Sequence, residues 1–134
     1  MGRKDIQPEI ECDADLIIEL PFFNNQQVTV WHDAEELKKF GTEEFADASY
    51  LHQFLDREDF SAAALRENRK DGSKTFVLFF PGGDPKIRTA VHEAIHTVDD
   101  ILDHLDIPIS AENVEVRCYL TDYIVSRLEE LYGW

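Results

Sequence analysis

The sequence has few of the residues that define specialised folds. Its 134 residues include 2 Cys, 6 Gly, 5 Pro and 1 Met. The two cysteines, Cys12 and Cys118, exclude a disulfide framework, and we expect both to be reduced thiols. The low Gly and Pro contents exclude a collagen-like or low-complexity chain, whereas 43% hydrophobic and 31% charged residues are typical of a globular one. The length predicts a single domain over residues 1–134.

Long hydrophobic runs are also missing. No stretch approaches the roughly 18 apolar residues that a membrane span needs. Residues 1–8 are polar and do not resemble a signal peptide. We therefore expect a cytoplasmic protein that does not insert into membranes.

Basic residues are scarce: 13 Lys and Arg face 28 Asp and Glu, which gives a net charge of −15. Nine carboxylates and no base lie between Lys4 and Lys38. The simplest interpretation of these acids is a solvated surface. Because such a surface repels phosphates and anionic lipids, we expect no direct binding of nucleic acid or membranes. A cation or a basic protein partner remains compatible with this charge.

Apolar segments of alternating or β-branched character predict four strands. They cover residues 15–20, 27–32, 60–68 and 75–80. The third segment is ambiguous between helix and strand, and we favour a strand because a turn follows it. A short helix is expected to begin after the N-cap Asp33 and to end at Gly41, with a second helix over residues 42–56.

Two long helices are predicted in the C-terminal part of the chain. The first follows the cap Asp84, has Pro85 in its first position and extends to about residue 105. The second follows Ser110 and covers residues 111 to about 131. These elements predict an α+β fold: a small, mostly antiparallel sheet covered by helices, with a C-terminal antiparallel helix pair.

The first long helix contains the motif His92-Glu93-Ala94-Ile95-His96. Histidines at i and i+4 lie about 40° apart on a helix, so both imidazoles can converge on one ion. Glu93 can take a proton from a metal-bound water, which is the chemistry of the HExxH helix in zinc peptidases. The apolar arc of the helix is centred about 140° from the bisector of the histidines, which predicts that the pair faces a cleft. Two surface histidines on a solvated helix are the plain alternative.

A catalytic zinc site needs a third protein ligand. Glu115 lies 19 residues after His96, and an antiparallel helix pair brings it back alongside the histidines. We expect Glu115 to be half-buried beside Cys118 at the edge of an apolar arc. Glu112 is the nearest competitor. The remaining candidates for the third ligand are Asp99, Asp103, His104 and Cys118, although Cys118 fits a small core residue better.

The HExxH motif, with a glutamate about one helical hairpin later, resembles the gluzincin type of zincin metallopeptidase. The predicted strand over residues 75–80, directly before the helix, also resembles that fold. Residues 92–125 (HEAIHTVDDILDHLDIPISAENVEVRCYLTDYIV) further resemble small HExxH proteins encoded by tailed bacteriophages, which would place the protein in the host cytoplasm. The resemblance covers residues 75 to about 128.

This resemblance implies one zinc ion per chain, with His92, His96 and Glu115 as ligands and Glu93 as general base. Gluzincins commonly have an acid four positions after the ligand glutamate, and this chain has Tyr119 there. Carboxylates that could orient the ligands instead are Asp99, Asp103 and Asp122. Candidate donors to the developing oxyanion are Tyr119, Tyr123 and His104. Each of these residues fits a surface or packing role equally well.

We therefore expect a zinc-dependent hydrolase that cleaves a peptide or protein substrate. The alternative is a non-catalytic, zinc-stabilised acidic protein that binds or inhibits a basic host protein. Neither an oligomeric state nor a role for residues 1–74 is predicted.

Overall fold

The computed structural model describes residues 13–20, 26–57 and 61–134. Its strands are β1 (Leu16–Glu19), β2 (Gln26–Trp31), β3 (Ala63–Asn68) and β4 (Lys74–Phe79). Its helices are α2 (Ala34–Glu44), α3 (Ser49–Leu55), α4 (Ile87–His104) and α5 (Val114–Tyr132), with a 3₁₀ turn, η1 (Ala111–Asn113), before α5. The predicted α+β class and all four predicted strands are confirmed.

The four strands form one mixed sheet in the order β1-β2-β4-β3. The outer pairs, β1 with β2 and β3 with β4, are antiparallel, whereas the central pair, β2 with β4, is parallel. A parallel pair needs a crossover connection, and here α2, α3 and β3 provide it. This arrangement leaves β3 as an edge strand of the sheet.

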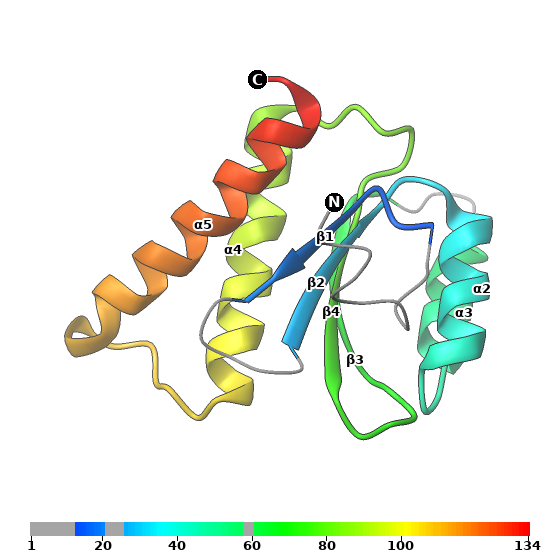
Figure 1. Cartoon of the computed structure of the whole chain (residues 1–134), viewed down its shortest axis with the longest axis horizontal. Coiled ribbons are helices and arrows are strands. Elements are labelled where there is room, and N and C mark those ends of the chain that lie inside the picture. The colour runs from blue at the N-terminus through cyan, green and yellow to red at the C-terminus, as the bar shows by residue number, and fades with distance from the viewer. Residues whose placement is uncertain (1–12, 21–25, 58–60) are drawn as a thin grey trace, which may run out of the picture.

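Helices cover both faces of the sheet: α4 and α5 lie on one side, and α2 and α3 on the other (Figure 1). Phe76 and Leu78 of β4 belong to the core under α4 and α5, whereas Val77 and Phe79 belong to the opposite core. Successive strand residues point to opposite faces, so a central strand covered on both sides is apolar throughout. This explains the run TFVLFF.

The boundary between α2 and α3 differs from the prediction. Asp33 is the N-cap of α2, as predicted, and its carboxylate accepts hydrogen bonds from the amides of Glu35 and Glu36. The predicted helix end at Gly41 is wrong, because α2 continues to Glu44. Gly41 is buried, and a Cβ there would lie 2.4 Å from Cδ2 of Leu51. The glycine therefore allows close packing of α3 on α2 and does not end the helix.

Helix α4 begins at Ile87, with Lys86 in the N-cap position and no side-chain cap. The predicted cap Asp84 and the predicted first helical residue Pro85 lie before the helix, so both assignments are wrong. A turn places α5 beside α4 in the opposite direction (Figure 1), which confirms the predicted helix pair. No helix in the described part of the chain has the length and apolar character of a membrane span.

The contact between the two long helices is uneven along α5. Leu120, Ile124 and Leu128 are buried against the sheet and α4. The start of α5 diverges from α4 (Figure 1), and Val114 and Val116 are exposed there. The second half of α5 therefore holds the helix in place, whereas its first turns project away from the core.

Candidate functional site

The HExxH motif lies in the middle of α4. Ala94 and Val98 of the same helix are buried in the core, whereas His92 and His96 are exposed. As expected from the sequence, α4 buries its apolar arc and turns the histidine pair away from the core, whereas the predicted cleft beside the pair stays a prediction. The two ring centroids are 4.8 Å apart, with an angle of 74° between the ring planes.

This spacing fits the binding of one zinc ion by both imidazoles. Zinc binds imidazole nitrogens at about 2.0–2.1 Å in tetrahedral geometry, which places the centroids of two such rings roughly 5 Å apart. The observed separation of 4.8 Å is close to that value. The separation of the two rings is therefore compatible with a shared zinc ion, and the assignment of His92 and His96 as ligands stays a prediction.

Glu93 is half-buried beside the two histidines. Burial raises the pKa of its carboxyl group, and the neighbouring His92 and His96 partly offset this effect. Asp100 lies two helical turns further along the same side of α4, and its backbone carbonyl accepts a hydrogen bond from Arg66 of β3 at 3.2 Å. Glu93 consequently lies on the side of α4 that borders the edge of the sheet.

Asp99 and Asp103 connect α4 to its neighbours. The guanidinium of Arg117 on α5 binds both carboxylate oxygens of Asp99, at 2.9 and 3.1 Å. Arg66 on β3 binds the carboxylate of Asp103 at 2.8 Å. Both acids, which we considered as residues that orient the ligands, therefore form ion pairs between elements.

Glu115 does not occupy the position that we predicted. It is exposed in the first turn of α5, so the predicted half-burial is wrong. Arg117 faces α4, and a residue two positions away lies on a different side of a helix. Cys118 is also exposed, which contradicts its predicted place in the core. The cause is the divergence of the first turns of α5 from α4. Glu112, the competing third ligand, is exposed as well.

The other candidate residues are spread over several parts of the fold. Tyr119 is 71% exposed, and Asp122 is also exposed. The hydroxyl of Tyr123 donates to the carbonyl of Glu19 at 2.9 Å and so attaches α5 to β1. The ring of His104 packs edge-on against Phe76, with the centroids 6.3 Å apart. Within the part of the chain that the structure describes, no three His, Cys, Asp or Glu side chains form a group able to hold a metal.

One polar pair was not found from the sequence. Nδ1 of His32 lies 2.8 Å from a carboxylate oxygen of Asp15, and this contact raises the pKa of His32. Leu16 pairs with Val30 in the antiparallel β1–β2 ladder, which brings the flanking Asp15 and His32 together. The two strands were predicted but their register was not, and without that register the sequence does not bring His32 and Asp15 together.

Comparison of the chain with protein-family models, curated proteins and solved structures gives no match. The resemblance to gluzincins therefore remains a prediction that rests on the motif and its spacing.

Proposed function

We propose that this protein is a zinc-dependent hydrolase of peptide bonds, with His92 and His96 as zinc ligands. The main support is the imidazole pair, with centroids 4.8 Å apart on the outer side of α4, next to the half-buried Glu93. Glu93 is partly removed from water beside the pair, as a general base with a raised pKa would be.

Glu93 is the proposed general base. Zinc held by His92 and His96 would lower the pKa of a bound water to about 7 and polarise a carbonyl group. The Glu93 carboxylate would accept the proton that this water loses on attack and pass it to the leaving amine. Burial raises the pKa of Glu93, and a general base works best when its pKa approaches the working pH.

The edge of the sheet supports a peptide substrate. β3 is at the end of the strand order and packs beside α4. An edge strand presents unpaired backbone groups, with which an extended peptide can form a further strand. The end of β3 is already occupied, because the amide of Ala46 donates to the carbonyl of Asn68 at 2.8 Å, so a peptide could pair only with the earlier residues of this strand. The Arg66–Asp103 ion pair fixes α4 relative to this edge, so a peptide along β3 lies next to the side of α4 that carries Glu93.

Glu115 is our proposed third ligand. Reaching the histidines requires the first turns of α5 to close toward α4 and also to rotate, because Arg117 now faces α4 and Glu115 lies on a different side of the helix. This movement would break the Arg117–Asp99 ion pair. Because these turns expose Val114 and Val116, closure buries apolar surface, and metal binding adds its own free energy to the closed form. Metal binding and ordering of this helix start are therefore expected to be coupled.

Metal content and peptide cleavage test the proposal together. We expect one zinc per chain, lost in both His92→Ala and His96→Ala. Glu115→Ala should weaken zinc binding by orders of magnitude, whereas the matched Glu112→Ala should leave it nearly unchanged. Glu93→Gln should retain zinc and lose cleavage of a peptide library. A zinc-loaded protein without activity, unaltered by Glu93→Gln, would contradict the proposed reaction.

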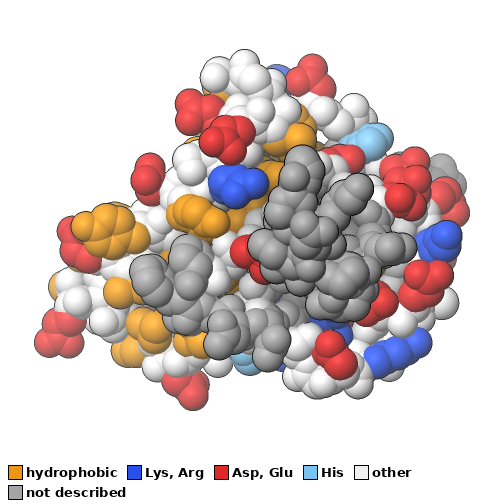
Figure 2. All heavy atoms as spheres, in the orientation of Figure 1, with side chains coloured by type: hydrophobic (Ala, Val, Ile, Leu, Met, Phe, Trp, Pro, Cys, Tyr) orange, Lys and Arg blue, Asp and Glu red, His pale blue; other side chains and the backbone are white. Residues whose placement is uncertain are grey.

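A second candidate function is the binding of a basic protein by a zinc-stabilised acidic surface. The observation that favours it is the exposed apolar group Ile109, Val114 and Tyr119. Figure 2 shows hydrophobic side chains over this end of α5 with acidic ones nearby. Under this function, removal of zinc abolishes binding of the partner, while Glu93→Gln has no effect. Failure to retain any basic partner at low salt would exclude it.

A further inference from the structure

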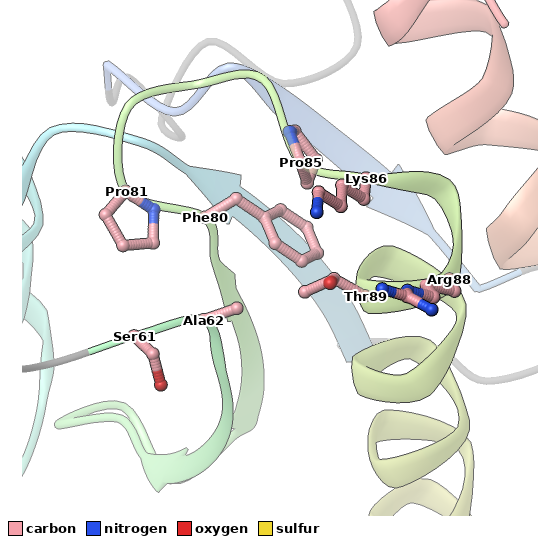
Figure 3. A pocket seen from close by; sticks show the side chains of 8 residues that line it. All are labelled: Ser61, Ala62, Phe80, Pro81, Pro85, Lys86, Arg88 and Thr89. Atoms are coloured by element: carbon pink, nitrogen blue, oxygen red, sulfur yellow. The ribbon is translucent and has the colours of Figure 1, made fainter.

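An open cavity of about 400 Å³ lies where the start of β3 meets the start of α4. Figure 3 shows Ser61 and Ala62 on one side and Thr89 with the first residues of α4 on the other, with the ring of Phe80 between them. Phe80 is buried and gives the cavity an apolar wall. No acidic residue lines this cavity among the residues that the structure describes.

Two cations, Lys86 and Arg88, line the same cavity. Neither forms an ion pair with any residue in the described ranges. Several other cations are paired with acids: Lys38 with Asp56, Arg66 with Asp103, Arg69 with Glu44, Arg117 with Asp99, and Arg127 with Glu130. Lys39, Lys70 and Lys74 also form no ion pair among the described residues, but none of these three lines the cavity. In a protein with a net charge of −15, two cations without an acidic partner at one cavity form a local site for an anion.

The remaining polar side chains of the cavity can donate hydrogen bonds. Ser61 and Thr89 contribute hydroxyl groups, and the first turn of α4 has no side-chain cap. An Arg guanidinium matches the geometry of a carboxylate and binds it through two parallel hydrogen bonds. A ligand with a carboxylate on a short aliphatic chain could bind the two cations through its carboxylate and contact the ring of Phe80 through its methylene groups.

The cavity also lies at a useful distance from the proposed catalytic group. Arg88 precedes His92 by four residues, or about 6 Å along the helix axis. An extended peptide rises about 3.3 Å per residue, so this distance corresponds to roughly two residues. β3 begins at Ala63, beside the cavity, and its Arg66 contacts the later part of α4. A peptide paired with β3 would therefore reach both the cavity and the histidine face.

We propose that this cavity is a substrate subsite for a carboxylate, located about two residues from the bond that is cleaved. The carboxylate comes from an acidic side chain or from the terminus of the peptide. The assignment rests on the proposed hydrolase function, and it makes acidic peptides the preferred substrates of an acidic protein.

Binding can be tested without turnover by using the zinc-loaded Glu93→Gln protein. Three alanine-rich heptapeptides, all acetylated, serve as probes: one with an internal Glu and an amidated end, one with Gln and an amidated end, and one with Gln and a free terminal carboxylate. A set with the Glu moved along the peptide locates the preferred position. We expect a carboxylate peptide to bind about tenfold more tightly than the neutral one, with amide shifts at residues 86–89 in NMR spectra.

Charge-matched variants distinguish an effect of the cavity on peptide binding from an effect of the net charge of the protein. Lys86→Gln with Arg88→Gln should abolish the preference for a carboxylate. Lys39→Gln with Lys70→Gln removes the same charge elsewhere and should leave the preference intact. Whether the internal Glu or the free terminus gives the tighter binding identifies the source of the carboxylate. Equal binding of all three peptides would overturn the subsite.

Measuring cleavage as well as binding distinguishes a failure of the carboxylate subsite from a failure of the proposed hydrolase function. If the zinc-loaded wild type cleaves Glu and Gln peptides at equal rates, the hydrolase assignment holds and the subsite is overturned. If carboxylate peptides shift residues 86–89 but no peptide is cleaved, the carboxylate site is supported and the hydrolase function is overturned. Faster cleavage of the carboxylate peptide, lost in the Lys86/Arg88 variant, supports both.

Discussion

Folding disfavours the ionised form of Glu93, because its carboxylate is partly removed from water. Burial therefore raises the pKa of this group. A carboxyl group with a raised folded-state pKa contributes most stability below its unfolded pKa, and this contribution is lost as the pH rises through the folded pKa. We therefore predict that Glu93→Gln stabilises the metal-free protein at pH 7, by well below about 1 kcal/mol because solvent still reaches the carboxyl group. Urea unfolding at pH 4 and pH 7 measures the difference.

The expected gain should nearly vanish at pH 4, where the carboxyl group is largely protonated. A variant that is more stable yet inactive would mark Glu93 as a group retained for function at a cost in stability. The contradictory outcome is a loss of stability at pH 7, which would mean that the carboxylate has a favourable partner in the fold.

His32 and Asp15 form a second titrating pair, in which the pKa of His32 is raised by the hydrogen bond and charge of Asp15. A histidine with a raised folded-state pKa contributes stability below its unfolded pKa of about 6.5 and loses it as the pH rises through the folded value. Asp15→Asn should therefore lower the pKa of His32 in an NMR titration and destabilise the protein more at pH 5.5 than at pH 8.5. Asp13→Asn removes a nearby acid without this contact, and an equal effect of both variants would refute the pair.

At the scale of elements, the Asp99–Arg117 ion pair connects the two long helices. Two parallel hydrogen bonds give it better geometry than most surface pairs, so we predict that Arg117→Gln costs about 0.5–1 kcal/mol. Arg127 forms a pair within α5, with Glu130 at 3.4 Å, and Arg127→Gln should have almost no effect. A double-mutant cycle with Asp99→Asn measures the coupling, and a coupling energy near zero would show that the pair does not hold the helices together.

Local sequence patterns predicted the helices and strands themselves better than they predicted which side chains these elements pack against. The histidine pair was predictable because i and i+4 positions share one face of any helix. Gly41 was misread as a helix end because its close contact with Leu51 comes from another helix. Glu115 was misplaced because apolar Val114 and Cys118 indicated a buried helix start, although both residues are exposed in the structure. Apolar residues show which face can be buried, and only tertiary structure determines whether a partner covers it.

The cavity could not be predicted from the sequence, because its position also depends on tertiary contacts. Ser61 and Arg88 line it from both sides but lie 27 residues apart in the chain. Their proximity follows from the antiparallel pairing of β3 with β4 and from the turn into α4. The sequence showed an acidic chain, and the structure adds that two of its few cations line one cavity without an acidic partner among the described residues.

For the whole molecule, the two cores share the sheet, and β4 contributes side chains to both. A substitution that destabilises the core on the α2 and α3 side of the sheet should therefore also destabilise the helix that carries the histidines. Leu51 of α3 is fully buried in the core that contains α2, and removing a buried leucine side chain costs about 2–5 kcal/mol. We predict that Leu51→Ala destabilises α4 as much as it destabilises α3, and the two tryptophans allow a direct measurement.

Trp31 is buried in the core with Leu51, whereas Trp134 packs against the opposite core and stacks on Tyr132. Trp134→Phe leaves a fluorescent reporter in one core, and Trp31→Phe leaves a reporter in the other. If the chain unfolds as one cooperative unit, each reporter gives a single transition, and Leu51→Ala lowers the free energy of unfolding by the same amount at both. The control Tyr50→Ala, at a side chain that is 60% exposed, should move neither transition appreciably. An earlier transition at Trp31 than at Trp134 would instead mean that the two layers unfold separately, and the histidine helix would then depend only on the core beneath it.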